Sequence, residues 1–69
     1  MNHFFVARRS AIAMLISEIN ALDVVNATLP PEMQARAAEC RRLLIALRAG
    51  RIDDFILPAE NPVQLTILD

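Results

Sequence analysis

The side chains that could do chemistry in this chain are a small group of carboxylates, one histidine and one cysteine. Asp53 and Asp54 are adjacent and Glu60 follows them, so together they could serve a metal ion or general acid–base catalysis. Neighbours in a chain point apart, however, and acid–base catalysis needs groups positioned in a dry cleft. We therefore interpret these carboxylates as solvated residues of turns.

His3 and Cys40 also lack the partners that catalysis or metal binding requires. His3 is the only histidine and has no carboxylate at the spacing of a metal site, so neither a metal site nor a Ser-His-Asp set can be built around it. Cys40 falls on the apolar stripe of a predicted helix, which predicts a buried thiol that packs as a small hydrophobe. The residues accordingly predict no enzyme activity, no cofactor and no metal.

Composition predicts a small protein that associates with other proteins. The chain has 69 residues, of which 55% are hydrophobic, and one cysteine cannot form an internal disulfide. Domains of this size bury only about 60% of the surface that their unfolded chains expose and usually need a partner, so we expect a homodimer. The net charge of −1 argues against nucleic-acid binding, which relies on concentrated positive charge. No run approaches the roughly 20 apolar residues of a membrane span, so we expect a cytoplasmic protein without membrane insertion.

The sequence predicts that the elements carrying any site form an all-α fold. We expect an antiparallel helical hairpin that dimerises into a four-helix arrangement. Apolar residues recur at three- and four-residue steps, and Pro30, Pro31 and Gly50 mark the breaks. We expect one helical-hairpin domain over 1–69, with a helix at 3–26, a turn at 27–30, a helix at 31–49 and a tail at 50–69. The recurring positions predict the dimer and core residues Phe5, Ile12, Leu15, Ile19, Leu22, Leu44 and Leu47.

The first helix is apolar on two faces and therefore needs two neighbours. The second helix covers one face, and the same surface of a second copy is the expected cover for the other. The alternative is that the C-terminal tail folds back over it. Within the tail, Val63, Leu65 and Ile67 alternate with polar residues, which predicts a short strand. This strand could pair with 55–57 in a hairpin, with the other protomer, or with the sheet edge of a partner.

One ridge of the second helix is the first candidate for a partner-binding surface. Arg41 and Arg48 lie one heptad apart with Ile45 between them, a combination that suits an acidic, partly apolar protein face. The alternative is that both arginines are ordinary solvated residues and Ile45 packs in the dimer. Arg42 pairs with Glu39 at the three-residue spacing. The further partner-binding candidates are Arg42, Phe55 and Leu57.

Two arginines at the beginning of the first helix are unfavourable for local helix energetics. Arg8 and Arg9 place positive charge at the positive end of the helix dipole. Binding to an acidic partner could retain them, and composition bias is the other explanation.

Read end to end, the chain resembles small phage proteins that act as quorum-sensing anti-activators in Mu-like phages of Pseudomonas. The words that carry the resemblance are the residue runs 4–9, 29–32 and 40–45, Phe-Phe-Val-Ala-Arg-Arg, Leu-Pro-Pro-Glu and Cys-Arg-Arg-Leu-Leu-Ile, together with the full length. The resemblance implies inhibition by direct binding of two host proteins, the LuxR-type regulator LasR and the pilus-extension ATPase PilB. It thereby implies a role in host takeover and superinfection exclusion in the host cytoplasm.

Two other functions compete with this inhibitor hypothesis. A structural helical subunit would assemble with itself or with phage components and have no host partner. A small DNA-binding regulator of helix-turn-helix type could use the Pro-containing turn and the Arg41-Arg42 helix, but the acidic balance of the chain argues against it.

Overall fold

The computed structural model describes residues 1–25 and 30–69 of the chain. Within these residues the elements follow the order β1 (Asn2–Val6), α1 (Arg8–Val25), α2 (Pro31–Arg48), β2 (Asp54–Leu57) and β3 (Val63–Ile67). The three strands form one sheet, so the expected all-α fold class is wrong and the chain is a mixed α/β structure. Most of the expected turn at 27–30 lies outside the described residues.

The N-terminal segment is a strand instead of the beginning of the first helix. The helix expected over 3–26 begins only at Arg8, because Asn2–Val6 pair in parallel with β3. Phe and Val are favoured in strands, and the pairing satisfies backbone groups that would otherwise face water. Phe5, expected in the dimer and core seam, therefore lies on a strand and has 59% of its surface exposed.

The C-terminal segment supplies the rest of the sheet, whose strand order is β1-β3-β2. β2 and β3 form an antiparallel hairpin in which Phe55 lies opposite Leu65 and Leu57 opposite Val63. Of the three pairings open to the tail strand, the structure has the hairpin within the same chain. The central strand β3 also pairs with β1, so the sheet joins the two ends of the described chain.

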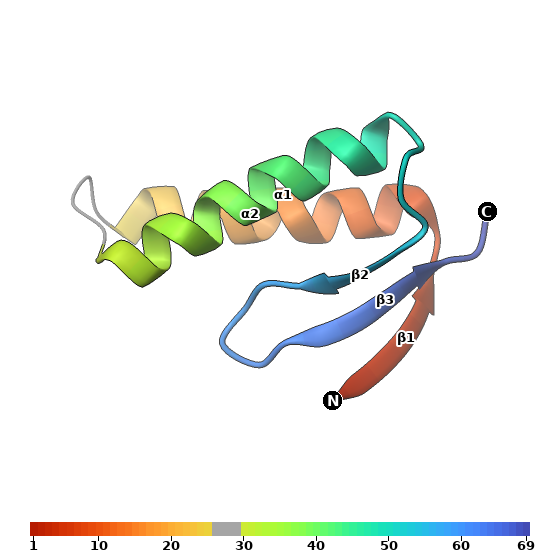
Figure 1. Cartoon of the computed structure of the whole chain (residues 1–69), viewed down its shortest axis with the longest axis horizontal. Coiled ribbons are helices and arrows are strands. Elements are labelled where there is room, and N and C mark those ends of the chain that lie inside the picture. Colours follow the sequence, from red (N-terminus) through yellow and green to blue (C-terminus); the bar gives the residue numbers. More distant parts are fainter. Residues whose placement is uncertain (26–29) are drawn as a thin grey trace.

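Both helices lie on one face of this sheet, with α1 and α2 side by side (Figure 1). Strand residues alternate between the two faces of a sheet. The strand side chains that meet the helices are Phe55, Leu57, Leu65 and Ile67. The second apolar face of α1 is thus covered by the sheet of its own chain, which replaces the second copy expected there. The core contains Ala11, Leu15, Cys40, Leu43, Leu47, Phe55, Leu57, Leu65 and Ile67.

The other positions expected in the dimer and core seam lie on the helices. Leu15, Leu22 and Leu47 are buried, whereas Ile12, Ile19 and Leu44 are partly buried and pack against the core. Helix α2 ends at Arg48, one residue before the expected boundary. There Gly50 takes a left-handed φ of 72°, and the Arg51 amide donates to the Ala46 carbonyl at 2.9 Å. This is a Schellman end, in which glycine adopts positive φ without a steric penalty.

Candidate functional site

The structure separates the six expected partner-binding residues into three places. Arg41, Ile45 and Arg48 are exposed on α2, and Ile45 has 67% of its surface accessible. Leu57 is buried in the core and therefore presents no surface to a partner. The remaining two, Arg42 and Phe55, line the same groove, although they belong to α2 and β2.

This groove lies between α2 and the edge strand β2 and has a volume of about 450 Å³. Its apolar lining comes from Leu43 and Phe55, which are almost fully buried, and from the more exposed Ile52 and Ile56. Its polar lining comes from Glu39, Arg42, Asp54 and Gln64. A hollow with an apolar floor and a few polar groups is the usual form of a site that binds another molecule.

The helix side of the groove is lined by an ion pair between two residues of α2 that lie one turn apart. Arg42 donates from Nε to Glu39 Oε1 at 2.8 Å and from a terminal nitrogen to Glu39 Oε2 at 2.6 Å, as the three-residue spacing predicted. This two-point hydrogen bond lowers the pKa of the Glu39 carboxyl. The two charges largely neutralise each other, so they contribute hydrogen-bonding groups more than net charge.

The strand side of the groove carries a carboxylate that no cation balances among the described residues. Asp54 accepts hydrogen bonds from Gln64 Nε2 at 3.0 and 3.1 Å and from Thr66 Oγ1 at 3.4 Å. These neutral donors hold the carboxylate in place without cancelling its charge. Instead of a solvated turn residue, Asp54 is the first residue of β2, and it gives this edge of the sheet a fixed negative charge.

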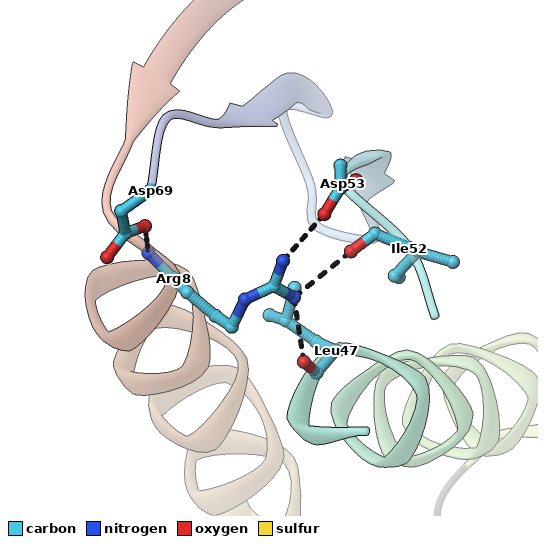
Figure 2. Close-up of polar contacts among 5 residues, drawn as sticks. All are labelled: Arg8, Leu47, Ile52, Asp53 and Asp69. Atoms are coloured by element: carbon cyan, nitrogen blue, oxygen red, sulfur yellow. Dashed lines mark hydrogen bonds and ion pairs between the residues drawn. The ribbon is translucent and has the colours of Figure 1, made fainter. Parts of the chain in front are cut away.

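Arg8 stabilises the fold and is not part of the groove (Figure 2). Its guanidinium donates to the Leu47 carbonyl at 2.8 Å, to the Ile52 carbonyl at 3.1 Å and to Asp53 Oδ1 at 2.6 Å. Its backbone amide donates to Asp69 Oδ1 at 2.7 Å. The Leu47 carbonyl belongs to the last turn of α2, where positive charge is favourable. The positive charge of Arg8 is unfavourable at the beginning of α1, but it lies at the negative end of α2. This contact explains why an arginine stands at position 8.

Cys40 is fully buried between the helices and the sheet, and its Sγ lies 3.8 Å from the Pro58 carbonyl oxygen. Burial raises the pKa of the thiol, and the nearby Glu18 carboxylate adds to the shift. The folded chain therefore keeps the thiol protonated at a pH where the unfolded chain has lost its proton. The free energy of unfolding should accordingly fall as the pH rises above 9.0, the ordinary pKa of a cysteine thiol.

We expect iodoacetamide to modify Cys40 slowly in the folded chain and completely in denaturant. The thiolate is the reactive form. The raised pKa lowers the fraction of thiolate, and burial keeps the reagent away from the sulfur. At neutral pH the native rate should be on the order of a hundredfold lower than the denatured rate, because reaction requires local opening. Mass spectrometry of timed samples measures both rates. Equal rates would contradict the buried placement of the thiol.

Several residues of the groove were not predicted as site residues, namely Glu39, Leu43, Ile52, Asp54, Ile56 and Gln64. They come from α2, the loop after it and both strands of the C-terminal hairpin. The sequence signals among them are the spacing of Glu39 from Arg42, which predicted their ion pair, and the alternation around Gln64, which predicted the strand. Neither signal predicted that α2 lies beside β2.

In the described part of the chain, no three His, Cys, Asp or Glu side chains gather where they could hold a metal ion. Neither described helix is long and apolar enough to cross a membrane. Comparison of the chain with family models, with curated proteins and with solved structures found no match.

Proposed function

We propose that this protein binds other proteins, and that it does so by holding an extended segment of the partner in the groove between α2 and β2. The observation that carries the proposal is the juxtaposition of a hollow that has an apolar floor with the outer edge of β2, which pairs with no other strand in the described part of the chain. The backbone groups along such an edge are a ready template for an added strand. Main-chain hydrogen bonds then supply affinity, and pockets for alternate side chains supply specificity.

The chemistry of the groove defines the segment that fits it. Apolar side chains of the segment would cover Phe55 and Leu43, which form the floor. A basic side chain would meet Asp54, whose carboxylate has only neutral donors among the described residues. The fitting segment is thus extended, contains apolar residues at alternate positions, and carries a Lys or Arg near its middle.

The resemblance described above supplies candidate partners for this surface. LasR, a LuxR-type regulator, and PilB, the pilus-extension ATPase, are the two host proteins that it implies. We propose that the chain inhibits them by contact, in the cytoplasm of the host cell, and that it does so without catalysis.

The test compares two isoleucines that are exposed to a similar degree on different surfaces. Ile56→Lys places a charge in the groove, and Ile45→Lys places the same charge on the ridge with Arg41 and Arg48. We expect Ile56→Lys to weaken the binding of purified LasR or PilB by at least about tenfold, a change of roughly 1.4 kcal/mol. Ile45→Lys should bind like the unaltered chain. Biolayer interferometry with immobilised chain measures both affinities.

Other outcomes have defined meanings. Loss of binding in Ile45→Lys alone would move the interface to the outer ridge of α2. Absence of binding by the unaltered chain to both candidate partners would contradict the partners that the resemblance implies. A panel of extended peptides with and without a central Lys would then test the groove itself, and equal failure of both sets would refute it.

A further inference from the structure

The opposite edge of the sheet has a different character. Among the described residues, the large hydrophobic side chains that remain exposed are Met1, Phe4, Phe5, Ile45, Ile56 and Leu68. Four of them lie on β1 or next to it, since Met1 precedes the strand and the Leu68 amide donates to the Val6 carbonyl at 2.9 Å. A concentration of exposed apolar side chains along one sheet edge indicates a contact surface.

We propose that β1 pairs with β1 of a second copy in antiparallel orientation, so that two three-stranded sheets join into one of six strands. This inference is independent of the proposed partner groove, which lies at β2. The strand order leaves the outer edge of β1 unpaired in the described chain. In an isolated molecule this edge would expose both its backbone groups and its phenylalanines to water.

The backbone geometry determines which residues would form the new hydrogen bonds. The Val6 carbonyl accepts from Leu68, so Val6 directs its polar backbone groups toward β3. Alternate residues of a strand direct theirs to opposite edges, and hence those of His3 and Phe5 point to the open edge. An antiparallel pair bonds where such residues lie opposite each other. A two-fold axis through Phe4 places His3 opposite Phe5 of the second copy, which gives two such bonded pairs.

The side chains of β1 are complementary to themselves in this register. On the sheet face away from the helices, the His3 and Phe5 rings already stack within one chain, with centroids 4.7 Å apart and an interplanar angle of 29°. His3 Nε2 also shares a 2.6 Å hydrogen bond with Thr66 Oγ1, which fixes the ring. Pairing around Phe4 would bring the stacks of the two copies side by side, so that four rings form one cluster. On the opposite face, the two Phe4 side chains would lie next to each other.

Charge decides in favour of β1 over β2 as the edge where two copies meet. The five residues of β1 include no Asp, Glu, Lys or Arg, and no Pro or Gly interrupts them. Natural sheets protect their edges with such residues, so this edge is unprotected. β2 in contrast begins with the charged Asp54, directly after Asp53, and charged residues on an edge strand disfavour its pairing with a second copy. Self-association therefore uses β1 and leaves the groove at β2 accessible.

The first test is the mass of the chain and of two lysine variants in solution. By analytical ultracentrifugation the unaltered chain should sediment at twice its 7.7 kDa mass at micromolar concentration. Phe4→Lys places two ammonium groups opposite each other at the two-fold axis and should sediment as a monomer with unchanged helical circular dichroism. Ile56→Lys, at a position exposed to the same extent (50% against 49%), should remain a dimer. A monomeric unaltered chain, or a dimeric Phe4→Lys, would overturn the proposal.

The second test reads the register directly and does not depend on the stability of the lysine variants. In a Cys40→Ala background, Phe4→Cys should form a disulfide between copies under mild oxidation, because the non-bonded antiparallel pair brings Cα atoms to about 4.5 Å. Phe5→Cys should not, since its counterpart lies diagonally at about 7–8 Å. Equal cross-linking of both variants, or none of Phe4→Cys, would refute this register. If Ile56→Lys loses partner binding but still forms the dimer, the two proposals are supported at separate edges of the sheet.

Discussion

Replacement of Leu15 by aspartate should leave the chain unfolded. Leu15 has no exposed surface and lies in the middle of α1, where it packs in the cluster that joins both helices to the sheet. The change removes the leucine side chain and buries a carboxylate without a partner, which together cost about 5 kcal/mol or more. A chain of this length has a total stability of roughly 3–10 kcal/mol. Circular dichroism should therefore show loss of helical signal and of the cooperative thermal transition.

Ser17→Asp is the matched control for this substitution. Ser17 is exposed on the same helix, two residues further along, so the new carboxylate stays in water. Its free energy of unfolding should remain within about 0.5 kcal/mol of the unaltered value. An unchanged helical spectrum and melting curve for Leu15→Asp would contradict the packing of α1 against the sheet.

Arg8→Ala should lower the free energy of unfolding by about 2–4 kcal/mol. Three hydrogen bonds from the guanidinium connect the beginning of α1, the end of α2 and the loop before β2. Truncation leaves the carbonyls of Leu47 and Ile52 without this donor and removes a positive charge from the C-terminal end of α2. The ion pair with Asp53 contributes the smaller part, because the Asp53 side chain is 73% exposed and water screens the interaction.

Two further variants separate the geometry of Arg8 from its charge. Arg9→Ala removes the same charge from the neighbouring, exposed position and should change the stability by no more than about 0.5 kcal/mol. Arg8→Lys keeps the charge but loses the planar guanidinium that reaches two carbonyls and a carboxylate. Its loss of stability should therefore lie between those of Arg9→Ala and Arg8→Ala. Urea denaturation followed by circular dichroism measures all three. Equal effects of Arg8→Ala and Arg9→Ala would show that the network has no structural role.

The sequence was sufficient for the part of the fold that depends on local pattern. The Pro30-Pro31 pair and Gly50 predicted the bounds of α2 to within a residue, because a helix beginning and end are set by neighbouring residues. The strand over Val63–Ile67 followed from its alternation. β1 was missed for the opposite reason. Phe5 and Ile12 continue the helical spacing, and nothing nearby shows that 2–6 pair with residues some sixty positions away.

The candidate site shows the same division between local and distant information. The Glu39–Arg42 pair could be predicted because both residues occupy one turn of a helix. The groove itself could not, since it exists only where α2 lies beside β2, and this packing depends on the whole sheet. For Arg8, the sequence showed an unfavourable charge at a helix beginning. The carbonyls that compensate it belong to residues 39 and 44 positions further along the chain.

The parallel pairing of β1 with β3 also determines how this domain should respond to mechanical force. A pull on Met1 acts at the beginning of β1, and a pull on Asp69 acts just after the end of β3 (Figure 1). Because the two strands run in the same direction, the opposed forces slide them past each other along their length. The evenly spaced bonds of the parallel ladder then carry the load together and cannot open one at a time. The strand pair thus acts as a clamp against stretching between its two ends.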